Sequence, residues 1–105
     1  MAAEHAADGL LLAERDTKEG LVVAVCDPDL LGETVENDDV SLTVTEEFYG
    51  GDPADAEAVT DSLARCTTAN LVGEAAVELA VEEGFVVEEN VMDIDGTPHA
   101  QLVWM

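Results

Sequence analysis

Acidic residues are spread among apolar residues along almost the whole chain, and this pattern limits the possible folds more than any other feature. The sequence holds 25 aspartates and glutamates against 3 lysines and arginines, for a net charge of −22. A disordered acidic tail would gather its charges in blocks and hold few apolar residues. Here 48% of the residues are hydrophobic. We therefore expect a folded domain with a packed core and a carboxylate-rich surface.

The length of 105 residues supports one packed core and is too short for two. We predict a single domain over residues 9–105, preceded by a flexible tail at residues 1–8. The tail has neither the basic end nor the apolar stretch of a secretory signal. No run reaches the roughly 20 apolar residues that a membrane-spanning helix needs. These observations predict a cytoplasmic protein with no membrane span.

The excess of acid indicates adaptation to a salt-loaded cytoplasm, such as that of an extreme halophile. At about 1 M salt the Debye length falls to about 3 Å, so surface carboxylates barely repel one another and keep the protein hydrated. The sequence holds one lysine, Lys18, and one isoleucine, Ile94, and both biases are familiar in halophile proteins. A nucleic-acid mimic or a binder of basic partners is the alternative, but mimicry favours a localised acidic stripe.

Three kinds of site are poorly supported by the sequence. No basic patch typical of nucleic-acid binding is present. Because molar salt weakens phosphate contacts, a salt-adapted RNA binder would depend on stacking and hydrogen bonds, and direct nucleic-acid binding stays open. Cys26 and Cys66 are a lone pair in a cytoplasmic chain, and we expect both to be reduced. No CxxC, CxxH or HExxH motif occurs, and we expect neither a metal nor a cofactor.

The first half of the chain has the patterns of β-strands. Two apolar runs, residues 10–14 and 21–26, are joined by a polar connection that ends in Gly20, which predicts a hairpin. Residues 40–45 alternate between apolar and hydroxyl side chains, which predicts a half-buried third strand. The turn-forming residues between these strands predict surface loops.

Helical patterns occupy the middle of the chain. Asp52-Pro53-Ala-Asp55 combines an acidic cap with a proline at the first helical position, and it predicts that a helix begins there. Apolar residues then recur with helical spacing, at Ala56, Val59, Leu63 and Cys66. A second helix is predicted from about Asn70, and Gly84-Phe85 indicates its end, because glycine accepts the left-handed conformation there.

The last segment, residues 91–104, predicts another hairpin built on the Asp95-Gly96 turn. Alternation places His99, Gln101 and Val103 on one side of its second strand and Ala100, Leu102 and Trp104 on the other. The order β-β-β-α-α-β-β predicts a two-layer α+β fold. Its mostly antiparallel sheet would have about five strands, with two helices packed on one face.

Three segments taken together resemble a known family. They are residues 47–51 (Glu-Phe-Tyr-Gly-Gly), 69–74 (Ala-Asn-Leu-Val-Gly-Glu) and 95–101 (Asp-Gly-Thr-Pro-His-Ala-Gln), preceded by Val25-Cys26-Asp27 and Leu31-Gly32. Their order and spacing are similar to the small archaeal family catalogued as domain of unknown function 424, over roughly Leu10 to Met105. The resemblance implies an archaeal cytoplasmic protein of one domain with a link to translation or ribosome-related machinery. It implies no particular reaction.

Seven residues of these segments are candidate binding residues: Tyr49, Gly50, Gly51, Asn70, Glu74, His99 and Gln101. Tyr49 lies in a glycine-rich connection, where we expect its ring to be exposed at a partner or ligand edge. The alternative is a plain connection in which Phe48 and Tyr49 fill the core. Asn70 and Glu74 are four residues apart and would share one face at the start of the second helix. Asn70 is also a suitable helix cap.

His99 is the most informative single residue, because histidine acts as a base, a ligand or a hydrogen-bond donor near neutral pH. The simpler interpretation is a half-buried histidine that ties the hairpin to a loop. Cys26 ends a strand where a nucleophile could stand, but the sequence shows no base beside it and a structural role is favoured. Asp93 and Asp95 with His99 could ligate a metal ion, but their spacing is weak evidence for a metal site, since carboxylates are common throughout this chain.

Two hypotheses of function follow. The first is a non-enzymatic binding or adapter module with a protein or ribonucleoprotein partner, using the Tyr49 connection and the strand of His99 and Gln101. The alternative is a small hydrolase or transferase with His99 as general acid or base oriented by Glu74, and with Asn70 or Gln101 binding substrate. Both require that the three segments meet in space.

Overall fold

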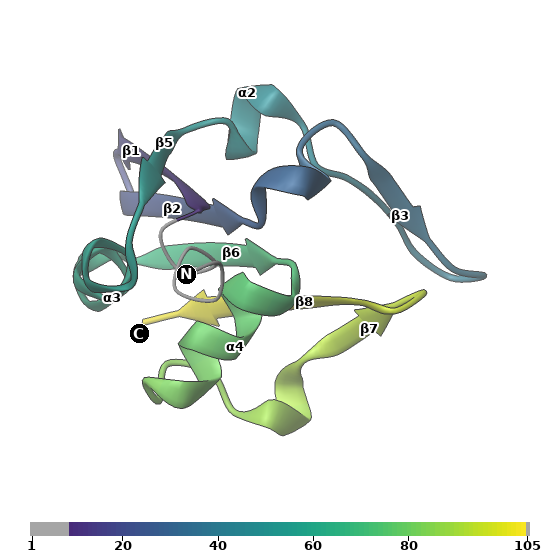
Figure 1. Cartoon of the computed structure of the whole chain (residues 1–105). Helices are drawn as coiled ribbons and strands as arrows, with labels where there is room; N and C mark the ends of the chain where they lie inside the picture. Colours follow the sequence, from purple (N-terminus) through teal and green to yellow (C-terminus); the bar gives the residue numbers. More distant parts are fainter. Residues whose placement is uncertain (1–8, 105) are drawn as a thin grey trace.

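A six-stranded sheet forms the centre of the protein. We describe residues 9–104 from a computed structural model (Figure 1), so the predicted tail at residues 1–8 lies outside the described residues. In spatial order the strands are β5 (Asp52–Ala54), β1 (Leu10–Thr17), β2 (Gly20–Cys26), β6 (Thr68–Val72), β8 (Thr97–Val103) and β7 (Met92–Ile94). None of the helices found in residues 9–104 is long and apolar enough to cross a membrane.

The strand pairings confirm a mostly antiparallel sheet of the α+β class. Four neighbouring pairs are antiparallel, and β2 pairs with β6 in parallel. Parallel neighbours need a long crossover connection, and residues 27–67 supply one. The predicted first hairpin is confirmed as β1 and β2, which turn at Lys18-Glu19.

Two helices cover one face of the sheet, as predicted. They are α3 (Ala56–Arg65) and α4 (Glu74–Glu82), which lie on the same side of the strands in Figure 1. Between helices and sheet lies the main core, in which Val59 and Leu63 of α3 and Val77 of α4 meet Val25 and Leu71 of the central strands. The helical spacing that ends at Cys66 was therefore a correct indication of the buried side of α3.

Smaller elements cover part of the opposite face. These are η1 (Pro28–Leu30), the hairpin of β3 (Thr34–Glu36) and β4 (Ser41–Thr43), and α2 (Glu46–Tyr49), and Figure 1 shows them on the side of the sheet away from α4. They build a second core with Cys26, Val44, Tyr49 and Val72 at its centre. The remaining short helix, η2 (Glu88–Asn90), precedes β7.

The predicted third strand, residues 40–45, is not part of the main sheet. Its central residues form β4, which pairs only with β3 in a separate two-stranded sheet among the described residues. The turn at η1 directs the chain away from β2, and Val44 then exchanges backbone hydrogen bonds with Gly32 and Glu33 at 2.7 and 2.9 Å. The predicted alternation still holds, because Val44 is fully buried.

The predicted start of the first helix at Asp52 is wrong by three residues. Asp52–Ala54 forms β5 at the edge of the sheet. Pro53 is tolerated on this edge strand, because no further strand there requires the backbone N–H that proline lacks. Asp55 is the actual cap, and its Oδ1 accepts a hydrogen bond from the Ala58 backbone N–H at 2.9 Å.

The predicted start of the second helix at Asn70 is also wrong. Residues 68–72 form the buried strand β6, and α4 begins at Glu74 after Gly73, whose φ of 112° interrupts any continuous helix. The apolar spacing of this segment is compatible with a helix, but its pairing with β2 and β8 makes it a strand. The predicted end is confirmed, because Gly84 has a φ of 84° and the Phe85 N–H reaches the Ala80 carbonyl at 2.9 Å.

The C-terminal hairpin is confirmed in its turn and its alternation. Asp95 and Gly96 have φ values of 53° and 89°, the two positive values of a type I′ turn. Ala100 and Leu102 are buried under the helices at 2% and 8% exposure. His99 and Gln101 therefore point to the other face of the sheet.

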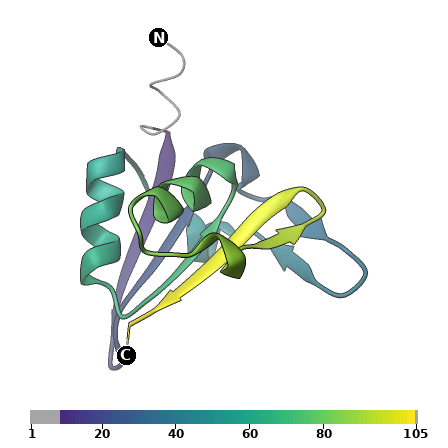
Figure 2. The same cartoon turned by 90° about the horizontal axis from the view of Figure 1, so that it is seen from below.

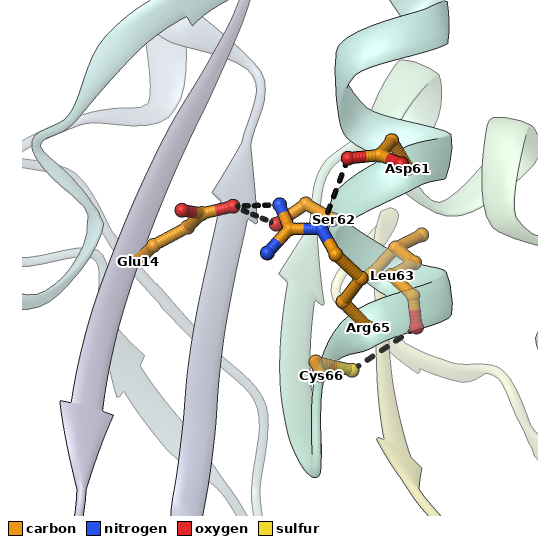
Figure 3. Close-up of polar contacts among 6 residues, drawn as sticks. All are labelled: Glu14, Asp61, Ser62, Leu63, Arg65 and Cys66. Carbon is orange, nitrogen blue, oxygen red and sulfur yellow. Dashed lines mark hydrogen bonds and ion pairs between the residues drawn. The ribbon is translucent and has the colours of Figure 1, made fainter.

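A polar contact links the sheet to α3 outside the two cores. The buried Ser62 hydroxyl donates a 2.5 Å hydrogen bond to the Glu14 carboxylate, and Arg65 donates to the same oxygen at 2.9 Å (Figure 3). Arg65 also pairs with Asp61 at 3.0 Å. The hydrogen bond from Ser62 is the main reason that the pKa of Glu14 lies below its ordinary value, with Arg65 adding to the effect.

Candidate functional site

Three of the candidate residues lie together on the sheet face opposite α3 and α4. Asn70 of β6 is directly opposite Gln101 of β8, and His99 is opposite Val72, one step further along the same ladder. Side chains of directly opposed residues have Cβ atoms about 5 Å apart and share one face. The residues of the second and third resembling segments therefore meet, although Asn70 stands on a strand and not at a helix cap.

Tyr49 covers the neighbouring part of this face but is not exposed. Only 3% of its surface is accessible, so the prediction of an exposed ring is wrong. The ring packs edge-on against Phe48 at 5.0 Å and completes the second core. Burial raises the pKa of the Tyr49 hydroxyl to about 12. The chain has only four aromatic residues to fill two cores. Tyr49 fills the smaller of them.

Gly50 and Gly51 lie at β1, on the far side of β2 and β6 from Gln101. A Cβ on Gly51 would stand 2.0 Å from the Leu12 carbonyl oxygen, so the backbone passes too close to β1 for any side chain. These glycines permit a close backbone approach, and the structure gives them no position beside Asn70, His99 and Gln101.

Glu74 lies at the start of α4 and borders two cavities. One, with a volume of about 420 Å³, is shared with Val77, Val81 and Pro98, and the other, of about 180 Å³, is shared with Asp27, Gly73 and Pro98. Pro98 and His99 are successive strand residues, so their side chains point to opposite faces of β8. Glu74 therefore borders the helix side of β8.

No hydrogen bond or ion pair joins Glu74 to His99 in the part of the chain that the structure describes. Burial lowers the pKa of His99, and no carboxylate acts against this effect. The proposed acid–base pairing of these two residues stays a prediction.

Cys26 is fully buried within the second core. Burial raises the pKa of its thiol to about 11, with Asp27 and Asp29 adding to the effect, so the group is protonated at neutral pH. A thiol in this state is a poor nucleophile. Cys66 is also buried, and its thiol donates to the Leu63 carbonyl at 3.2 Å. Within residues 9–104, no three histidine, cysteine, aspartate or glutamate side chains are placed to hold a metal ion.

The sheet face that carries Asn70, His99 and Gln101 has a property that the sequence analysis missed. It consists of the odd-numbered residues of β1 and β8, the even-numbered residues of β2, β6 and β7, and Pro53 of β5. None of these residues is aspartate or glutamate. The acidic residues of the same strands point to the helix side, as Glu14, Asp16 and Asp93 do. We call this surface the carboxylate-free face.

Half of the carboxylate-free face is covered and half is open. The second core covers Leu11 and Ala13 of β1, Ala24 and Cys26 of β2 and Val72 of β6, whereas Arg15 and Thr17 of β1 are exposed. Over β6, β7 and β8, Thr68, Asn70 and His99 are partly accessible and Gln101 is exposed. Met92 and Val103 on this half are 46% and 53% exposed. The alternation of side chains within each strand can be predicted from the sequence. Which residues of β6 and β8 share a face depends on the register between these two strands, which the sequence does not show.

The fold and this face define a class of small α+β proteins with a mixed six-stranded sheet, two helices on one side and a half-open second side. The chain belongs to the family described as protein of unknown function (DUF424), whose model matches residues 14–105. This finding confirms the resemblance drawn from the three segments.

One solved structure with this fold is the crystal structure of an uncharacterized conserved protein from Methanopyrus kandleri. The two chains are 27% identical, with a TM-score of 0.75, and the match covers 91% of this chain and 94% of the other. A comparison with curated proteins finds no match. The comparisons therefore show family and fold and assign no activity.

Proposed function

We propose that the protein is a non-enzymatic binding module that contacts a protein or ribonucleoprotein partner through the open half of the carboxylate-free face. The observation that carries this proposal is the absence of acidic side chains from the described strand residues of one face, in a chain with 25 aspartates and glutamates among 105 residues. Depletion of charge is the compositional mark of the centre of a protein interface.

The side chains on the open half suit a partner surface. Asn70, Gln101 and His99 supply hydrogen-bond donors and acceptors, and Met92 and Val103 supply exposed apolar area. A carboxylate here would have to give up its water on binding, which is costly without a paired cation. Asparagine and glutamine can exchange water for partner groups at a much smaller cost.

A protein surface fits this face better than a phosphate backbone does. Arg15 is the one basic residue among the described strand residues of the face, and its guanidinium donates to the Glu47 carbonyl and lies 5.1 Å from the centre of the Phe48 ring. It is therefore engaged within the molecule. The strand residues of the open half include no phenylalanine, tyrosine or tryptophan, so His99 is the one ring among them on which a base could stack.

The cellular setting belongs to the same proposal. The surface charge and the resemblance together favour the cytoplasm of a salt-loaded archaeal cell, with a partner in translation or ribosome-related machinery. The relative from Methanopyrus kandleri supports an archaeal setting.

The proposal is tested with a single added carboxylate. Gln101→Glu keeps the shape of an exposed side chain and places one charge in the open half. Tagged wild-type and variant proteins are used to capture partners from halophile lysate in about 3 M KCl, where the Debye length is below about 3 Å and general charge effects are screened. We expect specific recovery with wild type and a loss of about tenfold or more with Gln101→Glu, from desolvation of the new charge.

The matched control is Ala58→Glu, which adds the same charge at an exposed position on α3, away from the face. It should capture the partner as well as wild type does. Equal recovery by all three proteins, or no reproducible recovery by any of them, would contradict the proposed function.

A further inference from the structure

Strand β8 has a free edge next to the carboxylate-free face. Strand β6 pairs with β8 from His99 to Val103, whereas β7 pairs only with Thr97, Pro98 and His99 on the other side. Figure 2 shows the end of β8 near the C-terminus with β6 on one side and no strand on the other. Residues 100–103 are therefore an edge strand.

The hydrogen-bond pattern shows which backbone groups face this edge. The Gly73 N–H bonds to the Pro98 carbonyl at 2.9 Å, and the Trp104 N–H bonds to the Thr67 carbonyl at 2.9 Å. Backbone groups alternate in direction along an antiparallel strand, so even-numbered residues of β8 face β6. The N–H and C=O groups of Gln101 and Val103 therefore point outward, where no strand lies to bond them.

Exposed apolar side chains gather around the same edge. The large apolar residues that are strongly exposed in residues 9–104 are Val87, Met92, Val103 and Trp104, at 54%, 46%, 53% and 49%. All lie on β8, at its end, on β7 or in the segment leading to β7. Trp104 is held in place, because its indole N–H donates to the Leu63 carbonyl at 3.1 Å and its ring packs edge-on against Phe85.

The other partly free edge of the sheet is protected. On β1, strand β5 pairs only with residues 10–12, and the remaining edge carries Glu14 and Asp16. Charged side chains on an edge strand are a common defence against pairing with another chain. Residues 100–103 of β8, Ala-Gln-Leu-Val, have no such charge. The two edges of one sheet thus differ in their readiness to accept a strand.

We propose that the free edge of β8 receives an extended segment of a partner protein as an added strand, with apolar side chains at alternate positions and basic residues beside them. The inference rests on the proposed function, because it states how the module holds its partner. Outward N–H and C=O groups two residues apart match an extended backbone. Alternate apolar side chains would meet Val103 and Met92 on one face and Trp104 on the other.

Charge at contact distance, within the roughly 3 Å over which it acts in molar salt, favours this partner over a second copy. Three exposed carboxylates precede β8 in the sequence, on Glu88 and Glu89 of η2 and on Asp93 of β7. They favour lysine or arginine on the partner segment. A second copy brings another net charge of −22 to the contact. The free stretch is also short, which suits a single extended peptide.

The test uses a synthetic peptide, Lys-Lys-Val-Thr-Val-Thr-Val-Lys, and the same peptide with glutamate in place of lysine. Backbone amide exchange of the full chain is followed by NMR with and without each peptide. We expect the lysine peptide to slow exchange of the Gln101 and Val103 amides by about tenfold or more, since both amides become hydrogen-bonded. The glutamate peptide should have a much smaller effect.

Two proline variants give the matched control. Val103→Pro removes an outward N–H and leaves the bonds to β6 in place, and Asp16→Pro does the same on the protected β1 edge, where Asp16 also faces outward. Gln101→Pro is a second variant of the β8 edge. Folding of each is checked by the fluorescence of Trp104. We expect the β8 variants to lose peptide binding by about tenfold or more and Asp16→Pro to retain it.

Three results would overturn the inference: unchanged exchange at Gln101 and Val103, equal peptide binding by Val103→Pro, or sedimentation showing that these amides are protected by self-association. The proposed function has a separate outcome. If Gln101→Glu abolishes partner capture while Val103→Pro captures normally, the face is the contact surface and the β8 edge is not.

Discussion

His99 sits between Val72 of β6 and Met92 of β7 in the register of the sheet. The side chain is half-buried, and burial lowers the pKa of the imidazole below its ordinary value of 6.5. At neutral pH the ring is therefore uncharged, with one nitrogen able to donate and the other able to accept a hydrogen bond. A neutral His99 keeps the open half of the carboxylate-free face without charge.

The lowered pKa of His99 predicts a pH dependence of stability. Protonation is harder in the folded chain than in the unfolded chain, so the unfolded chain binds more protons once the pH falls below about 6.5. The contribution of His99 to the free energy of unfolding is therefore complete above this pH and is lost as the pH falls through it. Urea unfolding at constant KCl from pH 8 to pH 5 measures the effect in wild type and in His99→Gln.

The variant should show a weaker loss of stability than wild type between pH 7 and pH 5.5. Carboxylates titrate mainly below this window, so the difference between the two proteins isolates the imidazole. Parallel curves would show that burial does not disfavour the charged form of His99.

At the residue scale the sequence predicted one half of the site well. His99 and Gln101 share a face because strand alternation is a local property, and the Asp95-Gly96 turn fixes the hairpin. The position of Asn70 beside them depends on strand pairing with distant residues, and its local pattern suits a helix equally well. Tyr49 was predicted to be exposed from its glycine-rich surroundings, but the need to fill a second core decides its burial.

At the scale of elements, the junction between β6 and α4 depends on an aspartate that follows a neighbouring strand. Asp27 follows β2, and its carboxylate oxygens accept hydrogen bonds from the Ala75 and Ala76 N–H groups at 3.1 and 2.9 Å. The first turn of α4 is thus capped from a distance. Gly73 makes this possible, because a Cβ there would stand 2.4 Å from Cγ of Asp27.

Gly73→Ala should therefore be among the most destabilising changes in the chain. It forces a non-glycine residue into a φ of 112° and displaces the capping carboxylate. We expect a loss of about 3 kcal/mol or more in the free energy of unfolding, from backbone strain and a broken cap. Urea unfolding at fixed KCl concentration is the measurement.

Gly84→Ala is the matched control, since Gly84 also has a positive φ but has nothing within 4 Å of an added Cβ. This variant should lose only about 1 kcal/mol. Similar losses in the two variants would mean that contact with Asp27 does not matter.

The elements with strong local signals were predicted correctly. Both hairpins and the end of α4 follow from turn chemistry and alternation, which act over a few residues. The parallel pairing of β2 with β6 was not predicted, because no local pattern marks it. The small sheet of β3 and β4 was assigned to the main sheet for the same reason, since alternation shows a strand but not its partner.

For the whole molecule, the distribution of charge sets the conditions for folding. Carboxylates lie on the helix side of the sheet, in the loops, and on β3 and α2 of the opposite side. One arginine, Arg65, is already paired with Glu14 and Asp61. With a net charge of −22, repulsion among the surface carboxylates opposes the compact state at low ionic strength. The prediction of a salt-adapted surface therefore has a direct thermodynamic consequence.

Raising KCl from 0.1 M to 2 M should stabilise the protein by on the order of 2 kcal/mol or more, about 10 °C in midpoint temperature for a domain of this size. Screening of like charges is the physical reason. Thermal unfolding followed by circular dichroism is the measurement.

The control for this salt effect is a variant with four exposed glutamates changed to glutamine, Glu82, Glu83, Glu88 and Glu89. It should be more stable than wild type at 0.1 M and should gain less from added KCl. An equal gain in both proteins would point to preferential exclusion of salt rather than to charge screening.

The order of strands divides the sheet into two uninterrupted stretches of sequence. Residues 10–54 supply β5, β1 and β2, and residues 68–103 supply β6, β8 and β7. The parallel ladder from Val22 and Thr68 to Cys26 and Val72 is the one strand pairing that joins them in the described chain. The residues paired across this seam are 46 positions apart, as Val22 and Thr68 are, and this separation is close to the 44 positions between Leu10 and Ala54 of β1 and β5. The seam is where the two stretches of sequence become one sheet.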